Sequence, residues 1–183
     1  MLAAMMFASL AAHAQSYPAR PIRYLVGFVA GGNADSLARI VAVKFGELLG
    51  QQVVVDNRPG AGSILAGDLV AKANPDGYTL LQSGASLATN PVLRKSVPFN
   101  AQKDLLPVSM VARVANVLVV HPSMPAKSVS EYIAYAKANP RKLTYGTPGV
   151  GATAHLSMEL FQSMAGVALA HVPYKGGAPA LTD

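Results

Sequence analysis

Three segments rich in glycine and alanine have the spacing of loops that could hold a negatively charged ligand. They are GFVAGGNAD at residues 27–35, SGASLATNP at residues 83–91 and TPGVGATAH at residues 147–155. Each follows an apolar run typical of a buried strand and leads toward a helical pattern. Backbone N–H groups at the start of a helix point outward and favour a carboxylate or a phosphate, and small residues let that ligand come close. Each segment is therefore a candidate anion-binding loop, although any one of them taken alone is more typical of a plain turn.

The candidate ligand-binding residues lie in these three loops, none of which contains lysine or arginine. Thr153 could add a hydroxyl donor to the backbone N–H groups of its loop. His155 ends the third loop, where it could face a ligand or, as a single histidine, cap or pack against its own helix. The full predicted set is Ala30, Gly31, Gly32, Ser83, Ala85, Asn90, Thr147, Gly149, Gly151, Ala152, Thr153 and His155.

The first loop copies the opening six positions of a nucleotide phosphate loop, with glycine at residues 27 and 32. Asn33 and Ala34 stand where that motif requires lysine and then serine or threonine. The lysine would reach the phosphates and the hydroxyl would hold magnesium. Because both are missing, binding of a nucleoside triphosphate is not predicted.

Two segments mimic the glycine fingerprint of dinucleotide-binding proteins. The third loop matches it over residues 149–154, but no acidic residue lies between Glu159 and Asp183 to hold the ribose. The other mimic, GAG at residues 60–62, has Leu65 where the third glycine belongs. Dinucleotide binding needs all of these features, so the sequence predicts no nucleotide and no other cofactor.

Residues suited to catalysis or metal binding are sparse. The chain has no cysteine, which excludes a thiolate nucleophile, a disulfide and a cysteine-bound zinc ion. His121, His155 and His171 lack the paired spacing of metal ligands. Ser83 lies in LQSGA, which differs from the GxSxG elbow of a serine nucleophile. The sequence predicts neither an enzyme nor a metal site, and a small hydrolase that uses Ser83 or His155 is the alternative.

The composition indicates a folded protein with a positive field. The 183 residues are 51% hydrophobic and 13% charged, which supplies enough apolar material for a buried core. The formal net charge is +6, but the 15 basic residues are scattered and no aromatic residues alternate with them, so no nucleic-acid partner is predicted. The charge either attracts small anions or is an idle basic surface.

Apolar periodicity predicts a parallel sheet with helices in the first hundred residues. The order is strand, helix, strand, helix, strand, which implies right-handed crossovers. The expected elements are a strand at 22–28, a helix at 37–49 ended by Gly50, a strand at 53–57, a turn and helix at 58–73, and a strand at 78–81. Asp35 lies near the start of the first helix, four residues before Arg39, where it would stabilise the helix; ligand contact is its second interpretation.

A second series of strands and helices follows residue 125. Before it, residues 107–122 contain two β-rich runs that could cross between domains. The later elements are a helix at 128–140 opened by Ser128 or Ser130, a strand at 143–147, a helix at 153–166, a strand at 169–174 and the start of a helix after 175. Ligands bind beyond the carboxyl ends of parallel strands, which is where the candidate loops fall.

Residues 1–15, MLAAMMFASLAAHAQ, form a short apolar run that contains the A-x-A pattern Ala12-His13-Ala14. This pattern is typical of a secretory signal peptide, here residues 1–14. The run is too short to span a bilayer, which takes roughly 20 residues. No lysine or arginine precedes it, so a start codon further upstream and a frayed apolar N-terminus are the alternatives.

Longer blocks connect these local patterns to a family. Five blocks run in one order from Tyr17 to the end of the chain: YPARPIRYLVGFVAGGNADSLAR, VVVDNRPGAGSILAGDLVAKANPDGYTLL, LATNP, AKANPRKLTYGTPGVGATAHLSMELF and HVPYKGGAPAL. Together they resemble the Bug family, the extracytoplasmic solute-binding receptors of tripartite tricarboxylate transporters. One departure is Gly27, because family members more commonly carry proline at this position.

The resemblance implies an α/β protein with the two-lobed periplasmic binding protein type II fold, whose parallel-sheet lobes close on a small ligand. The first lobe would comprise residues 15–112 and the second residues 113–183. Family members are considerably longer, so the second lobe is expected to be incomplete and the chain alone to be aggregation-prone.

The resemblance also implies a function in the periplasm. The ligand would be a small carboxylate, an amino acid or a related molecule, held mostly by loop backbone and hydroxyl groups and partly through water. The partner would be a two-subunit membrane permease, and the receptor itself would be monomeric. A ligand-free relic or regulatory adaptor with the same fold is the alternative.

The A-x-A pattern predicts cleavage after Ala14, because signal peptidase requires small residues at these two positions. We expect mass spectrometry of periplasmic material to find Gln15 as the mature N-terminus. Intact Met1 on soluble cytoplasmic protein would contradict export.

Overall fold

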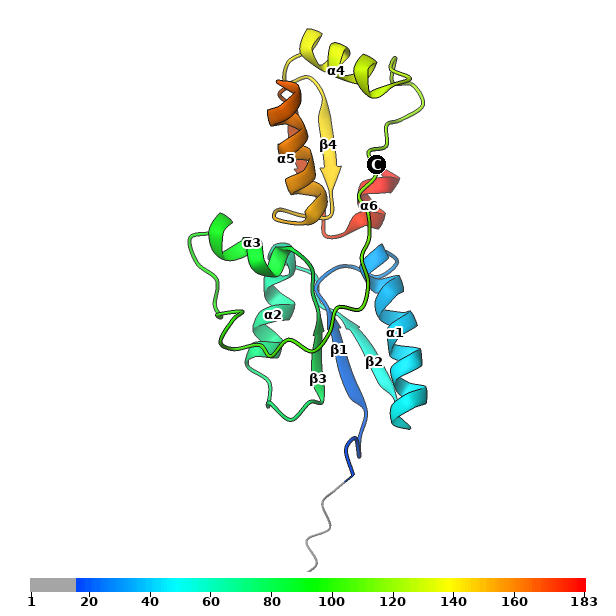
Figure 1. Ribbon diagram of the computed structural model, residues 1–183, viewed down its shortest axis with the longest axis vertical. Coiled ribbons are helices and arrows are strands. Elements are labelled where there is room, and N and C mark those ends of the chain that lie inside the picture. The colour runs from blue at the N-terminus through cyan, green and yellow to red at the C-terminus, as the bar shows by residue number, and fades with distance from the viewer. Residues whose placement is uncertain (1–15) are drawn as a thin grey trace, which may run out of the picture.

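The computed structural model describes residues 16–183, which form two parallel β-sheets placed one above the other along the long axis of the molecule (Figure 1). The predicted signal peptide lies outside the described residues. The first sheet has three parallel strands in the order β2-β1-β3. The elements of this first lobe are β1 (Ile22–Val26), α1 (Asn33–Leu49), β2 (Val53–Asn57), the 3₁₀ turn η1 (Ala61–Ser63), α2 (Ile64–Ala71), β3 (Thr79–Gln82) and α3 (Ser86–Leu93).

The central strand β1 carries the core of the first lobe. Ile22, Leu25 and Val26 are fully buried, because β1 has a strand on each side. Val26 belongs to the same apolar cluster as Ala38 and Ala42 of α1, whose small side chains let the helix lie close to the sheet. A continuous apolar strand covered in this way is typical of a parallel sheet.

The second lobe repeats the arrangement with fewer elements. It contains α4 (Val129–Ala138), β4 (Thr144–Thr147), α5 (Thr153–Ala165), β5 (Ala170–Pro173) and α6 (Gly177–Thr182). Strands β4 and β5 pair in parallel. The strands of the two lobes point toward each other, so that their carboxyl ends meet (Figure 1). Within residues 16–183, no helix combines the length and the apolar character needed to cross a membrane.

Two helix boundaries follow signals that the sequence contains. Gly50 ends α1 in the left-handed conformation, with φ of 64°, where glycine is unstrained. Ser128 begins α4, and its hydroxyl accepts a hydrogen bond from Glu131 N at 3.2 Å. Of the two serines predicted to open this helix, Ser128 is therefore the capping residue.

Residues 107–121 join the lobes as an extended connector, and the prediction of β-rich strands in this segment is wrong. The side chains of Val117 and Val119 are 78% and 63% exposed. A strand persists only where a neighbouring strand takes up its backbone hydrogen bonds, and none of the described strands pairs with the connector. The expected lobe boundary between residues 112 and 113 lies inside it.

Helix α3 is a second difference, because only a small-residue turn was predicted at these residues. The sequence of α3 has small residues and no clear apolar periodicity, and it contains Pro91, which removes one backbone hydrogen-bond donor and argues against a helix. Buried Asn90 ties the helix down: Nδ2 donates to Gly62 O at 2.8 Å, and Oδ1 accepts from Arg94 Nε at 3.3 Å. Tertiary contacts thus stabilise a helix that local signals do not predict.

The exposed apolar connector predicts self-association. Replacing Val117 and Val119 together by lysine removes apolar surface and adds charge, so sedimentation velocity should show a larger monomer fraction. The free energy of unfolding should change by less than about 0.5 kcal/mol, since neither side chain is buried.

The matched control places the same two charges on Ser109 and Ala112, which are exposed in the same connector. If that control reduced self-association as much as the valine substitutions, charge rather than apolar surface would be the cause.

Candidate functional site

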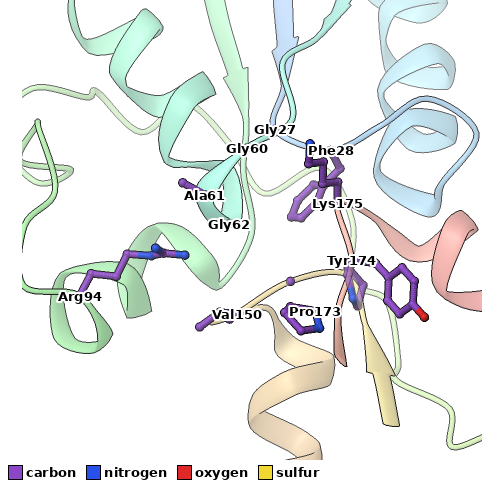
Figure 2. A pocket seen from close by; sticks show the side chains of 12 residues that line it. Gly27, Phe28, Gly60, Ala61, Gly62, Arg94, Val150, Pro173, Tyr174 and Lys175 are labelled. Atoms are coloured by element: carbon purple, nitrogen blue, oxygen red, sulfur yellow. The ribbon is translucent and has the colours of Figure 1, made fainter. Parts of the chain in front are cut away.

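A cavity of about 200 Å³ lies where the carboxyl ends of the two sheets meet (Figure 2). The loops after β1 and β2 line it from the first lobe, and the loops after β4 and β5 line it from the second. The lining residues are Gly27, Phe28, Gly60, Ala61, Gly62, Arg94, Pro148, Gly149, Val150, Pro173, Tyr174 and Lys175. In parallel-sheet proteins the strand ends are the usual place for a ligand.

A larger and more open depression of about 590 Å³ lies between α1 and the free edge of β2. Apart from Arg39 and Gln52, its lining is apolar or glycine. It lies away from the loops at the carboxyl ends of the strands. The cavity between the lobes is therefore the candidate functional site.

Hydrogen bonds join the two lobes around this cavity. Val29 N donates to Lys175 O at 3.1 Å, and Thr89 Oγ1 donates to Gly151 O at 2.8 Å. A Cβ atom placed on Gly176 would lie 2.8 Å from Val29 Cγ2, so glycine is needed for these loops to meet. The residues of the candidate loops thus hold the lobes together.

Asp35 fixes the loop after β1. Its side chain is buried, and Oδ2 accepts hydrogen bonds from Gly31 N at 2.9 Å and from Arg39 Nε at 3.0 Å. The bond from Arg39, together with that from Gly31, lowers the pKa of Asp35 to about 2 against the opposing effect of burial. The predicted pair of Asp35 with Arg39 is confirmed, and the Gly31 N–H is already used within the loop.

Gly27 lines the cavity where Ser63 fills the neighbouring space. A Cβ atom built on Gly27 would lie 1.8 Å from Ser63 Oγ, which is far inside van der Waals contact. Ser63 is buried and has a left-handed backbone with φ of 74°. Gly27 is therefore matched in size to Ser63 across from it.

Arg94 and Lys175 bring two positive charges to the cavity. Figure 2 shows the Arg94 side chain reaching from the end of α3 toward the loops of Gly62 and Val150. Its Nε donates to Asn90 Oδ1, which orients the guanidinium group. A guanidinium, an ammonium and the surrounding loop backbone form a set of donors suited to an anion.

Arg94 and Lys175 were not among the predicted site residues, and the turn at residues 60–62 was predicted as a turn but not as part of the site. That turn fails the dinucleotide fingerprint, yet it follows β2 at the same sheet edge as the loop after β1. The same argument applies to Lys175, which follows β5. For the turn at residues 60–62 and for Lys175, the position directly after a parallel strand was the sequence signal that could have placed them at the site. Arg94 follows a helix, and no sequence signal marks it.

Three rings stack behind the loop at residues 147–153. The centroids of His155 and His171 are 4.2 Å apart, and those of His171 and Tyr145 are 4.8 Å apart. Burial, and then the neighbouring His155, lower the pKa of His171. Burial, and then the hydrogen bond that the Tyr145 hydroxyl donates to Glu159, raise the pKa of Tyr145. The stacked rings are thus partly buried and pack behind the loop.

Thr147 and His155 hold the backbone of this loop from behind. Thr147 Oγ1 accepts from Gly149 N at 3.3 Å and lies 2.6 Å from His171 Nε2. Gly151 N donates to His155 Nδ1 at 3.3 Å. Neither Thr147 nor His155 is among the residues that line the cavity.

Comparison with known proteins identifies the family. Residues 37–183 match the model of the tripartite tricarboxylate transporter family receptor. The chain belongs to this receptor family. Protein BugT of Bordetella pertussis is 45% identical over 172 residues, which are 93% of this chain and 53% of BugT. The resemblance to the Bug family is confirmed, and the chain spans about half the length of the relatives it matches.

Solved structures of similar sequence share the fold. An R. palustris protein with adipate has a TM-score of 0.89 and 42% identity, covering 91% of this chain and 56% of that one. The periplasmic binding protein BugD has a TM-score of 0.81 and 35% identity, covering 91% of this chain and 56% of that one. MatC from Rhodopseudomonas palustris with bound malate has a TM-score of 0.78 and 30% identity, covering 91% of this chain and 57% of that one. The predicted two-lobed α/β fold with parallel sheets is confirmed.

The twelve ligand-binding residues predicted for this receptor-family chain differ in their relation to the cavity. Gly149 lines it. Asn90, Thr147, Gly151 and His155 lie outside the lining and are hydrogen-bonded to the loops that form it or to the opposite lobe. The others lie further along the candidate loops, and they are Ala30, Gly31, Gly32, Ser83, Ala85, Ala152 and Thr153.

Two predicted hydroxyl donors have partners other than the cavity. Thr153 Oγ1 donates to Asn116 Oδ1 of the connector at 3.3 Å. Ser83 is exposed, and its hydroxyl makes a long contact of 3.4 Å with Gly84 O. Contact of these residues with a ligand stays a prediction.

Substituting Asp35 by asparagine should lower the free energy of unfolding by about 1.5–3 kcal/mol at pH 6, because charge-assisted hydrogen bonds are lost. The folded-state pKa of about 2 lies below the ordinary 3.8. The stabilisation is therefore present above pH 4 and is lost as pH falls through 2. Denaturant unfolding should show that the gap between the wild type and the variant narrows at pH 2.

Glu47→Gln is the control, since the Lys44–Glu47 pair is exposed and contributes less than about 0.5 kcal/mol. An Asp35 variant no less stable than the Glu47 variant would show that this ion pair does not support the loop.

Proposed function

We propose that this chain acts as a periplasmic solute-binding receptor that captures a small dicarboxylate between its lobes and delivers it to a two-subunit membrane permease. The observation that carries the proposal is the cavity between the strand ends, which is lined by loops of both lobes and by Arg94 and Lys175. A ligand that contacts both sets of loops stabilises the closed arrangement of the lobes.

The charge and size of the cavity favour a small anion. Two cations and no acidic side chain are among its lining residues, and the net charge of +6 attracts anions from solution. Pockets for drug-sized molecules occupy roughly 300–1,000 Å³, whereas this cavity has about 200 Å³. The size therefore supports a compact organic acid or amino acid rather than a nucleotide.

Two structural relatives support the choice of a dicarboxylate. One was solved with adipate and the other with malate, and both molecules carry two carboxylates. In the proposed complex, Arg94 binds one carboxylate, and the loop at residues 147–151 lies against the other end of the molecule. Because much of this surface is backbone, fit between the lobes contributes to selection along with side-chain contacts.

The alternative of a small hydrolase has no observation in its favour. Among the described residues, Ser83 has no hydrogen bond to a histidine, and His155 accepts from a backbone N–H. A nucleophile and its base need to lie within hydrogen-bond reach. A ligand-free adaptor of the same fold is distinguished by the binding experiment that follows.

Isothermal titration calorimetry with adipate tests the proposal. Adipate should bind, whereas hexane-1,6-diol, of equal chain length but uncharged, should not bind measurably. Arg94→Gln should weaken adipate binding by about 10- to 100-fold, as expected from the loss of one charge-assisted hydrogen bond.

Lys95→Gln is the matched control, because Lys95 is exposed, adjacent in sequence and not part of the lining. Equal losses in both variants would point to long-range charge rather than contact. If adipate, malate and a panel of amino acids all failed to bind to the folded chain, the adaptor alternative would be favoured.

A further inference from the structure

The peptide groups of Gly151 are held from both lobes at once. Its N–H donates to His155 Nδ1 of the same lobe at 3.3 Å, and its carbonyl accepts from Thr89 Oγ1 of the opposite lobe at 2.8 Å. Gly151 has φ of 80°, and a Cβ atom there would lie 2.8 Å from Thr89 Oγ1. Glycine is thus needed here both for the backbone conformation and for the close approach.

The hydrogen bond from Gly151 requires one form of the His155 ring. Nδ1 can accept only when it carries no proton, which is the neutral ring with its proton on Nε2. His155 Nε2 lies 3.8 Å from Glu159 Oε1. The ring is largely buried and stacks on His171, which limits its freedom to turn the other nitrogen toward the loop.

We propose that Thr89 and His155 are positioning residues that clasp Gly151 from opposite lobes, so that the closed arrangement of the receptor depends on a neutral His155. The inference rests on the proposed function, because the clasped loop carries Gly149 and Val150 of the solute cavity. Thr89 joins the lobes directly, and His155 keeps the Gly151 peptide in the orientation that Thr89 requires.

Protonation of His155 breaks the clasp. It would place a second N–H group opposite the Gly151 N–H, so the hydrogen bond is replaced by a contact between two donors. The titratable groups around the ring are Glu159 on α5 and, through the stack, His171 on β5 and Tyr145 on β4. The loop should therefore loosen, and solute affinity fall, as pH decreases.

Two pairs of variants separate positioning from simple structural support. His155→Asn keeps an acceptor at the place of Nδ1 and cannot titrate, whereas His155→Gln puts its amide at the place of Nε2. Thr89→Ser keeps the hydroxyl, and Thr89→Val replaces it with a methyl group of similar size. Ser130→Ala, on an exposed position of α4, is the control.

The first measurement follows the ¹⁵N and ¹H shifts of the Gly151 amide against pH, without any solute. We expect one titration step in the wild type, little change in His155→Asn and, in His155→Gln, an amide shifted at every pH. A Gly151 amide that is independent of pH in the wild type and alike in both His155 variants would overturn the clasp.

The second measurement is the affinity for adipate from pH 8 to pH 5. It should fall by about 3- to 10-fold in the wild type, the range of one neutral hydrogen bond. The fall should be smaller in His155→Asn, in which protonation of adipate itself remains, and Thr89→Val should bind more weakly than Thr89→Ser. Wild-type affinity that rises on acidification, or Thr89 variants of equal affinity, would overturn the clasp.

The two measurements distinguish failure of the clasp from failure of the proposed function. If the Gly151 amide titrates as expected but adipate does not bind, the clasp stands and the solute assignment fails. If adipate binds with the same affinity and pH profile in all variants, the solute assignment stands and the clasp is wrong.

Discussion

The structure depends on the close approach of backbone to backbone where its two lobes meet. A Cβ atom on Gly62 would lie 2.7 Å from Val150 O, and one on Gly176 would lie 2.8 Å from Val29 Cγ2. Contacts this short exclude any larger side chain without movement of a loop. The glycines are therefore needed less for flexible turns than for the distance between the lobes. Hydrogen bonds such as Val29 N to Lys175 O form only because this distance is short.

This constraint explains what kind of site the protein can build. Seven of the twelve residues that line the cavity are glycine, alanine or proline, so much of its wall is backbone. Charge is supplied from outside the three small-residue loops, by Arg94 after α3 and by Lys175 after β5. Asp35 and Asn90 do not line the cavity, yet they fix the loop backbone and the guanidinium group that do. The site is therefore ordered by buried polar residues behind its surface.

The fold was predictable from the sequence wherever the signal is local or periodic. Continuous apolar strands, the left-handed Gly50 and the capping Ser128 are such signals. Helix α3 was missed because its stability comes from Asn90 and Gly62, which are far apart in the sequence. The connector was predicted as strands because β propensity says nothing about the presence of a partner strand. Of the three predicted loops, those at residues 27–35 and 147–155 contribute lining residues to the cavity and the one at 83–91 contributes none. Which residues face the cavity depends on contacts between the lobes. The Gly31 N–H is taken by Asp35, and Arg94 reaches the cavity from a helix end.

The central claim is that an anionic solute binds between the lobes at the strand ends. Titration of ¹⁵N-labelled protein with adipate, followed by NMR, tests it most directly. We expect the largest shift changes at the amides of Gly27, Gly62 and Gly149 and at the Arg94 side chain, with both lobes responding at the same adipate concentration. Shift changes confined to one lobe, or centred on Val43 and Val54 in the depression between α1 and β2, would contradict it.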